Sequence, residues 1–236
     1  MLPQVGFDQR LGAKLPLDLS FRDESGRSVR LGSLFGRRPV VLAFAYHTCP
    51  MLCPMVQEGL ASGLKPLALA AGRDFDVVVV SIDPEDTPAR AAAAKRQTLE
   101  RYGRAGAAAG FHYLTGREPA IRALARAAGF RYERVPERGE YAHTAGVVVA
   151  APDGTVARYL FGIEPAPRDL RLALVEAAAG KVGSLVDQLL LYCFHYDPSL
   201  GRYSAAIMRL LRAAAVATVL GLAGLVLLLR RREVGP

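Results

Sequence analysis

Two uninterrupted apolar runs dominate the pattern of hydrophobic and polar positions along this chain. Residues Val40 to Tyr46 and Phe75 to Ile82 are almost entirely apolar. Runs of this kind, without alternation, are typical of strands that are buried on both faces. Ahead of them, Leu15 to Phe21 alternates, residues 23–26 form a turn and residues 29–31 return, which predicts a β-hairpin.

Between the predicted strands lie segments whose apolar residues have helical spacing. Thr87 suits the N-cap of one helix and Pro88 its first turn, while Asp153-Gly154 predicts a hairpin turn. The expected helices cover residues 54–69, 88–102, 118–128 and 168–179, and further strands cover 111–114, 146–150 and 156–161. This order predicts an α/β fold with a thioredoxin-like central sheet, flanking helices and an N-terminal β-hairpin.

The C-terminal part of the chain has a different character. Residues 213–229 carry no charge, and from residue 205 onward the segment is long enough for a transmembrane helix, which three arginines close. We therefore expect an irregular lead-in (1–14), a thioredoxin-like domain (15–182), a juxtamembrane segment (183–204), a transmembrane helix (205–229) and a basic tail (230–236).

Two signals for the orientation of this anchor conflict. The arginines at 230–232 favour a cytoplasmic C-terminus, which puts the domain on the periplasmic, extracytoplasmic side, although Arg202, Arg209 and Arg212 weaken the bias. The first residues of the given sequence contain no apolar stretch that could serve as a signal peptide. We expect the extracytoplasmic arrangement, and a tail-anchored cytoplasmic protein is the alternative.

Charge and cysteine count narrow the function. The net charge of the 236 residues is +8, but the arginines are scattered among acidic residues and form no basic stripe, so we expect no nucleic-acid partner. Cys49, Cys53 and Cys193 are the three cysteines, too few for a disulfide-stabilised scaffold.

Cys49 and Cys53 follow the first apolar strand directly, and a helix is predicted to begin at or just after Cys53. The partial positive charge of a helix N-terminus lowers the pKa of a nearby thiol, and the thiolate is the form that attacks disulfides and binds metals. Pro50 and Pro54 stiffen the loop. The pair can cycle between dithiol and disulfide, or bind a soft metal ion; an inert structural pair is the third possibility.

Three motifs together resemble the Sco/SenC family over about residues 10 to 180. They are the Cys-x-x-x-Cys within Tyr46 to Pro54, the stretch Ser81-Ile82-Asp83-Pro84 followed by Asp86-Thr87-Pro88, and His143 ahead of the strand at 146–150. Proteins of this family are thioredoxin-fold, membrane-anchored copper-binding proteins that help to assemble cytochrome c oxidase.

The resemblance implies that Cys49, Cys53 and His143 are copper ligands, with His143 in a loop at residues 137–144. Two thiolates and one imidazole suit Cu(I) and can also hold Cu(II). The implied partners are the membrane and the cytochrome c oxidase subunit that carries a copper site.

The chain departs from the family pattern in two places. The family usually has an aspartate between the cysteines, where this chain has Met51 and Leu52. The usual family anchor is N-terminal, whereas the anchor expected here is C-terminal. An uncharged loop can change the affinity for copper or the redox potential.

Other candidate residues carry weaker signals. The resemblance implies that Asp83 lies near the cysteines. The alternative is that its carboxylate only caps a helix or a turn. His47 adjoins the copper loop but is expected to point away from it, and His112 is expected to be structural. Cys193 and His195 could form a soft metal site near the membrane, although a packed juxtamembrane segment is favoured.

Three functions use these residues. The first is a copper metallochaperone, which has no turnover of its own. The second is a thiol–disulfide oxidoreductase, with Cys49 and Cys53 as the redox pair that reduces the cysteines of the oxidase copper site. The third is a peroxidase of the peroxiredoxin kind, which expects a threonine where this chain has Tyr46. The chaperone is the prediction and the oxidoreductase is its alternative.

Overall fold

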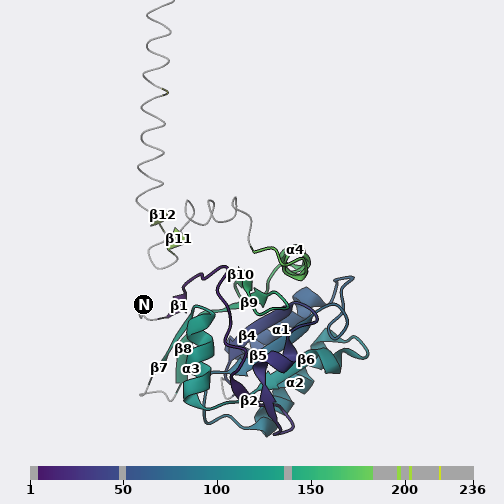
Figure 1. Ribbon diagram of the computed structural model, residues 1–236, viewed down its shortest axis with the longest axis vertical. Coiled ribbons are helices and arrows are strands. Elements are labelled where there is room, and N and C mark those ends of the chain that lie inside the picture. The colour runs from purple at the N-terminus through teal and green to yellow at the C-terminus, as the bar shows by residue number, and fades with distance from the viewer. Residues whose placement is uncertain are drawn as a thin grey trace, which may run out of the picture. The chain divides into compact units, whose positions relative to one another are not determined.

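A computed structural model describes residues 5–47, 52–135, 140–182, 196–197, 202–203 and 218. The chain divides into two compact units, of which one is residues 2–183 and the other is Met1 with residues 184–236. In the second unit, the described strands β11 (Tyr196–Asp197) and β12 (Arg202–Tyr203) pair antiparallel. Cys49, Cys53 and His143 belong to the unit of residues 2–183, whose helices and strands are labelled in Figure 1.

The core of the first unit is a five-stranded mixed sheet in the order β10-β9-β4-β5-β6. Strand β4 runs parallel to β5, which runs parallel to β6, while β9 is antiparallel to both β4 and β10. The bounds are β4 (Val40–Ala45), β5 (Asp76–Ser81), β6 (Phe111–Leu114), β9 (Gly146–Ala150) and β10 (Val156–Phe161). All residues of β4, β5 and β9 are buried, which confirms the reading of the apolar runs as central strands.

Four helices flank this sheet: α1 (Leu52–Leu64), α2 (Pro88–Tyr102), α3 (Glu118–Ala127) and α4 (Pro167–Ala178). The predicted start of α2 is confirmed, since the Thr87 hydroxyl accepts a hydrogen bond from the backbone N–H of Arg90 at 3.3 Å and Pro88 follows the cap. The predicted end of α1 near residue 69 is wrong. The helix stops at Leu64 because Pro66 disfavours a helical conformation in the residue before it.

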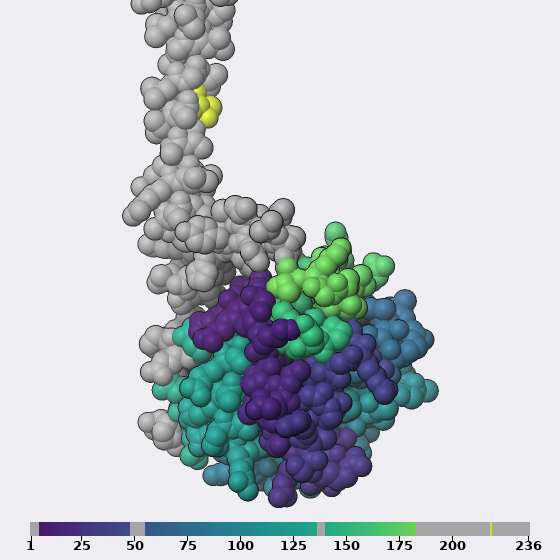
Figure 2. Space-filling model, in the orientation of Figure 1, coloured from purple at the N-terminus to yellow at the C-terminus, as the bar shows by residue number. Residues whose placement is uncertain are grey.

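The predicted N-terminal hairpin is present as β2 (Ser20–Arg22) and β3 (Ser28–Arg30), followed by the 3-10 turn η1 (Leu31–Leu34). A second 3-10 turn, η2 (Ala107–Gly110), leads into β6. Residues 12–15 of the lead-in hydrogen-bond to the turn between β9 and β10. In Figure 2 this N-terminal segment, in purple, lies against the green part of the chain.

A second sheet, β1-β7-β8, was not predicted from the sequence. It consists of β1 (Gly6–Phe7), β7 (Phe130–Val135) and β8 (Glu140–His143), paired antiparallel. The lead-in is therefore not wholly irregular, and His143 ends a strand rather than lying within a loop. Strands β7 and β8 are only half-buried and carry several charged residues, so they lack the apolar run that identified the central strands. Figure 1 shows α3 beside these strands, on the flank away from α1 and α2.

The expected transmembrane helix at 205–229 and the juxtamembrane segment fall almost entirely outside the described residues. Within the residues that the structure describes, no helix is both long enough and apolar enough to cross a membrane.

Candidate metal centre

The topology of the central sheet brings the candidate metal-binding segments to one edge. The carboxyl ends of the parallel strands β4, β5 and β6 lie at the same edge. Because β9 is antiparallel to β4, with Ala43 opposite Val147, the amino end of β9 lies there too. The cysteine segment follows β4, and His143 lies three residues before Gly146, the first residue of β9. The sheet therefore delivers both segments to the edge where α/β folds bind their ligands.

The two cysteines are only partly described. Cys49 lies outside the described residues. Cys53 is the second residue of α1, so this helix begins one residue before it rather than at or after it, and its side chain lies outside the described part. A position in the first turn puts the Cys53 backbone in the positive end of the helix dipole, which favours a thiolate.

His143 is held by two aromatic rings. Its ring centroid lies 6.0 Å from that of Tyr46, with the planes at 79°, and 6.0 Å from that of Phe130, with the planes at 55°. The Nδ1 atom of His143 is 3.0 Å from the carbonyl oxygen of Thr144. A carbonyl oxygen only accepts, so we assign the proton to Nδ1 and the lone pair to Nε2.

Burial lowers the pKa of His143, and the hydrogen bond to Thr144 opposes this shift. A neutral imidazole is the form that binds a metal, since an imidazolium has no lone pair to donate. The bond from Nδ1 to a backbone carbonyl is also the way in which metal-binding histidines are commonly oriented. His143 therefore has the tautomer and the charge that a metal ligand needs.

We call the cluster of Tyr46, Phe130, Tyr141 and His143 the aromatic side of the site. The rings of Tyr46 and Tyr141 meet edge to face, with centroids 5.5 Å apart, and Phe130 stacks on buried Phe44 at 4.6 Å. Tyr141 and His143 are two residues apart on β8, so they share one face of that strand. Sequence reasoning missed the roles of Tyr141 and Phe130; an alternating pattern at 141 and 143 was the available signal.

The other side of the chain at Tyr46 and His47, where it leaves β4, is polar. The backbone N–H of His47 donates to Oδ2 of Asp86 at 2.7 Å, and the hydroxyl of Ser81 donates to the same oxygen at 2.6 Å. The Asp86 side chain is fully buried, and Arg90 Nη1 lies 3.7 Å from its other oxygen. Asp86 thus ties the start of the cysteine segment to the carboxyl end of β5 and to α2. Sequence reasoning used Asp86 only as part of the family motif.

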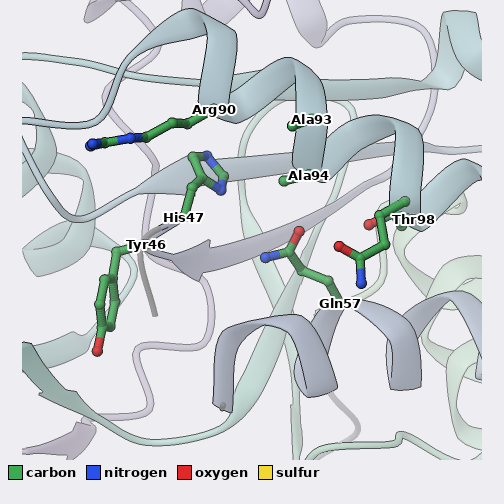
Figure 3. A pocket seen from close by; sticks show the side chains of 8 residues that line it. Tyr46, His47, Gln57, Arg90, Ala93, Ala94 and Thr98 are labelled. Carbon is green, nitrogen blue, oxygen red and sulfur yellow. The ribbon is translucent and has the colours of Figure 1, made fainter. Parts of the chain in front are cut away.

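A cavity of about 190 Å³ adjoins His47 on this polar side. Its walls come from the end of β4, from α1 and from α2: Tyr46, His47, Gln57, Arg90, Ala93, Ala94, Gln97 and Thr98. Figure 3 shows the rings of Tyr46 and His47 pointing in opposite directions from neighbouring residues, with His47 turned toward the helices. His47 therefore points away from Tyr46 and from the ring of His143 that Tyr46 contacts. The expectation that it points away from the copper loop stays a prediction, because residues 48–51 lie outside the described residues.

The His47 ring is buried without hydrogen bonds to its nitrogens among the described residues. Both ring nitrogens are buried, and neither has a hydrogen-bond partner among the residues that the structure describes. The ring lies 5.9 Å from that of Tyr113. Burial is the main cause that lowers the pKa of His47; Asp86 and Asp83 oppose the shift, and Arg90 adds to it. The neutral form predominates here as well.

The remaining candidates have structural roles or are undescribed. Asp83 Oδ1 accepts from the backbone N–H of Glu85 at 2.9 Å, which is a turn role, and it lies 3.5 Å from the hydroxyl of Tyr141. His112 Nε2 lies 3.9 Å from Oδ1 of Asp76, the first residue of β5 and so at the other edge of the sheet. Cys193 and His195 lie outside the described residues. Within the described ranges, no three histidine, cysteine or acidic residues converge closely enough to hold a metal ion.

Solved structures resemble this fold. A proposed electron transfer protein from Aquifex aeolicus VF5 has 25% identity and a TM-score of 0.63, covering 73% of this chain and 96% of its own. The apo Sco1 protein from Thermus thermophilus has 27% identity and a TM-score of 0.53, covering 76% and 99%. Copper-bound ScoI from Arabidopsis thaliana has 20% identity and a TM-score of 0.56, covering 72% and 99%, and its likeness shows the fold alone.

No curated protein matched this chain. The family model described as SCO1/SenC matches residues 8–176, which is most of the chain and includes the whole central sheet. The resemblance seen in the sequence is thereby confirmed, and the chain belongs to the SCO1/SenC family.

Proposed function

We propose that this protein binds copper through Cys49, Cys53 and His143 and delivers it to the copper site of a cytochrome c oxidase subunit. Membership of the SCO1/SenC family supports this role. Arabidopsis ScoI has been solved with copper bound. BsSco, which is 22% identical to this chain, is a member of the Sco family of cytochrome c oxidase assembly proteins.

The observation that carries the proposal is the setting of His143. It comes from β8, far from the cysteines in sequence, yet it packs against Tyr46, which stands three residues before Cys49. Its Nδ1 is engaged by Thr144, and burial keeps the ring neutral. A surface histidine without a ligand role would have no need of this orientation.

The donor set fits copper as a cargo. Two thiolates and one imidazole are soft or intermediate ligands, which suit Cu(I) better than Mg²⁺ or Ca²⁺. The thiols lose their protons when the metal binds, so binding weakens as the pH falls. Met51 and Leu52 put no charge between the cysteines, which leaves the bound ion without a neighbouring carboxylate from that loop.

The experiment is a copper-binding measurement on purified protein under reducing conditions. Wild type should bind about one copper ion per chain, and His143→Ala should lose roughly 100-fold or more in affinity, above the range that outer-shell partners of metal ligands typically cost. His47→Ala is the matched control, because His47 is the other histidine at this edge but faces away. Equal affinity in His143→Ala and wild type would refute the three-ligand site.

A second function, reduction of disulfides in the partner, uses the same cysteines. BsSco is described as having a disulfide switch, which favours this candidate as well. The two functions separate at His143, since thiol–disulfide exchange needs only Cys49 and Cys53. His143→Ala should therefore keep its rate of disulfide exchange with a dithiol reductant while losing copper.

The proposal includes attachment to a membrane by residues 205–229, with the domain on the extracytoplasmic side. The uncharged stretch and the arginines at 230–232 support it. A membrane-impermeant thiol reagent applied to intact cells should label Cys193 if this arrangement is right, and should fail to label it if the domain is cytoplasmic.

A further inference from the structure

We propose that the cavity between the end of β4, α1 and α2 is a binding site for a small uncharged molecule that carries a carboxamide group. The polar groups around it include those of His47 on the chain that leaves β4, Gln57 on α1 and Thr98 on α2. This site is separate from the copper function proposed above and does not depend on it.

The first observation is that Gln57 is buried without a hydrogen bond. The residue is 5% exposed, and its side chain makes no hydrogen bond among the residues that the structure describes. Figure 3 shows its amide directed from α1 toward the ring of His47. Buried amides are costly to leave unpaired, and most are hydrogen-bonded in native proteins. Gln57 therefore offers an acceptor and two donors to the occupant of the cavity.

A second unpartnered group borders the same cavity. Both ring nitrogens of His47 are buried, and neither has a hydrogen-bond partner in the part of the chain that the structure describes. Because burial lowers the pKa of this imidazole, the ring is neutral, so one nitrogen donates and the other accepts. His47 stands two residues before Cys49, and Gln57 stands one turn after Cys53 on α1. Two elements thus bring unsatisfied polar groups to one cavity from the two ends of the cysteine segment.

The size and depth of the cavity fit a small molecule. Its volume is about 190 Å³, whereas a single water needs only about 10–15 Å³. Gln57 and Thr98 are 5% and 3% exposed, so these binding groups lie beneath the surface. Ala93 and Ala94 add an apolar wall on α2. A molecule with a polar head and a short alkyl part can be enclosed here whole, which a side chain attached to a docked protein cannot.

The charges around the cavity favour an uncharged ligand. Arg90 is the one charged residue among the described residues that line it, and its guanidinium lies 3.7 Å from a carboxylate oxygen of buried Asp86. Figure 3 shows the head group of Arg90 directed away from Gln57. An anion in the cavity would therefore lose its hydration without gaining an unpaired cation as a partner.

A carboxamide matches the groups that remain. Its N–H and its oxygen can exchange two hydrogen bonds with the amide of Gln57, and its second N–H can donate to the unprotonated nitrogen of His47. Its alkyl part can then lie against Ala93 and Ala94.

The test is a titration of the copper-free full chain in detergent with acetamide, followed by nuclear magnetic resonance. The side-chain amide signal of Gln57 and the ring signals of His47 report contact directly. Acetate is the matched probe, because it has nearly the shape of acetamide but carries a charge. Gln57→Leu keeps a side chain of similar size without its amide, and His112→Ala, on β6, is the control variant.

Acetamide should bind saturably to the wild type and shift the signals of Gln57 and His47 together. Acetate should bind at least about tenfold more weakly, and Gln57→Leu should lose at least about tenfold in affinity for acetamide. His112→Ala should bind acetamide as the wild type does. Equal binding by Gln57→Leu and the wild type, or no saturable binding at all, would overturn the site and leave water as its occupant. Acetate binding as tightly as acetamide would overturn the choice of an uncharged ligand, and this result needs no variant that has to fold.

Discussion

The chain at Tyr46 and His47, where it leaves β4, has an aromatic side and a polar side, and the two sides are packed differently. On the aromatic side, the rings of Tyr46 and Phe130 contact that of His143, and the ring of Tyr141 contacts that of Tyr46. On the polar side, His47 borders a cavity of about 190 Å³, and its backbone N–H donates a hydrogen bond to Asp86. Each side contains a histidine whose pKa is lowered by burial.

The difference shows that nearness in sequence to the cysteines does not decide which way a histidine points. His47 is two residues from Cys49, but its ring turns toward α1 and α2. His143 is more than ninety residues away, and β8 brings it to Tyr46. A close-packed side can fix the direction of an imidazole, whereas the side with the cavity positions the backbone and leaves the ring nitrogens of His47 without partners among the described residues.

The largest predicted effect concerns the aromatic side. Phe130 is 2% exposed and contacts Phe44, Phe7 and the ring of His143. Phe130→Ala should lower the free energy of unfolding by about 3–5 kcal/mol, since it removes a buried ring and leaves a cavity. Urea denaturation of the copper-free protein measures this. Phe161→Ala, the same change at a half-exposed ring, should cost less than about 1.5 kcal/mol.

Similar losses for Phe130→Ala and Phe161→Ala would show that the aromatic side is not a close-packed unit. The comparison between the two sides would then lose its basis, because close packing around Phe130 would not be what orients His143.

The sequence predicted the central sheet because its strands are buried on both faces. The apolar runs at 40–46 and 75–82 predict central strands because every side chain in such a strand is buried. Thr87 and Pro88 marked the start of α2. It did not predict β1, β7 and β8. Their burial depends on contacts between residues far apart in the chain, such as Phe7 with Phe130, which no local pattern reveals.

The next effect concerns the polar side. Asp86→Ala would leave the N–H of His47 without its acceptor, and would leave the hydroxyl of Ser81 with only the carbonyl oxygen of Asp83 at 3.3 Å. We expect a loss of about 2–4 kcal/mol in the free energy of unfolding, because hydrogen bonds to a charged group are worth about 1.5–3 kcal/mol each and buried donors are costly to leave unpaired. Thermal and urea denaturation measure this.

Asp86→Asn separates charge from hydrogen bonding on the same side. The amide oxygen can still accept from His47 and Ser81, so this variant should recover most of the stability. If Asn is as damaging as Ala, the ionic contact with Arg90 matters more than the hydrogen bonds do.

The histidines of both sides predict a pH dependence in the copper-free protein. Burial lowers the pKa of His47 and His143 in the folded state, so below about pH 6.5 the unfolded chain binds protons that the folded chain does not. Their contribution to stability is complete above that pH and is lost as the pH falls toward the folded-state pKa values. The slope should reach at most about 1.4 kcal/mol per pH unit for each histidine.

Denaturation between pH 7.5 and 5.5 tests this, with His47→Gln and His143→Gln each expected to flatten the curve. If only His143→Gln does so, the cavity on the polar side hydrates His47 well enough to let it protonate in the folded protein.

The candidate metal ligands could be named from the sequence only by the family resemblance. The strand, the Cys-x-x-x-Cys and the following helix indicated thiol or metal chemistry at the sheet edge, but nothing local distinguished His143 from His47 as a ligand. Their directions are set by β8 and by the turn after β4. Tyr141 and Asp86 went unrecognised because their roles depend on contacts across the edge.

The smallest predicted effect is that of Tyr141→Phe, which tests whether the aromatic side supports the copper site through its rings and not through the Tyr141 hydroxyl. Tyr141→Phe keeps the ring that meets Tyr46 and removes a hydroxyl that lies 3.5 Å from Oδ1 of Asp83, longer than a good O–H···O bond. Burial, with help from Asp83, raises the pKa of Tyr141 to about 12, so the phenol carries no charge at neutral pH. Removing it should therefore change the free energy of unfolding by about 0.5 kcal/mol or less and leave copper affinity within about twofold. Tyr141→Ala, which removes the ring, should weaken copper binding clearly because Tyr46, whose ring contacts that of His143, loses a packing neighbour. Copper titration of the three proteins side by side decides the matter. A loss in Tyr141→Phe as large as that in Tyr141→Ala would mean that the hydroxyl and Asp83 take part in holding the site, and that the division into an aromatic and a polar side does not extend to the metal.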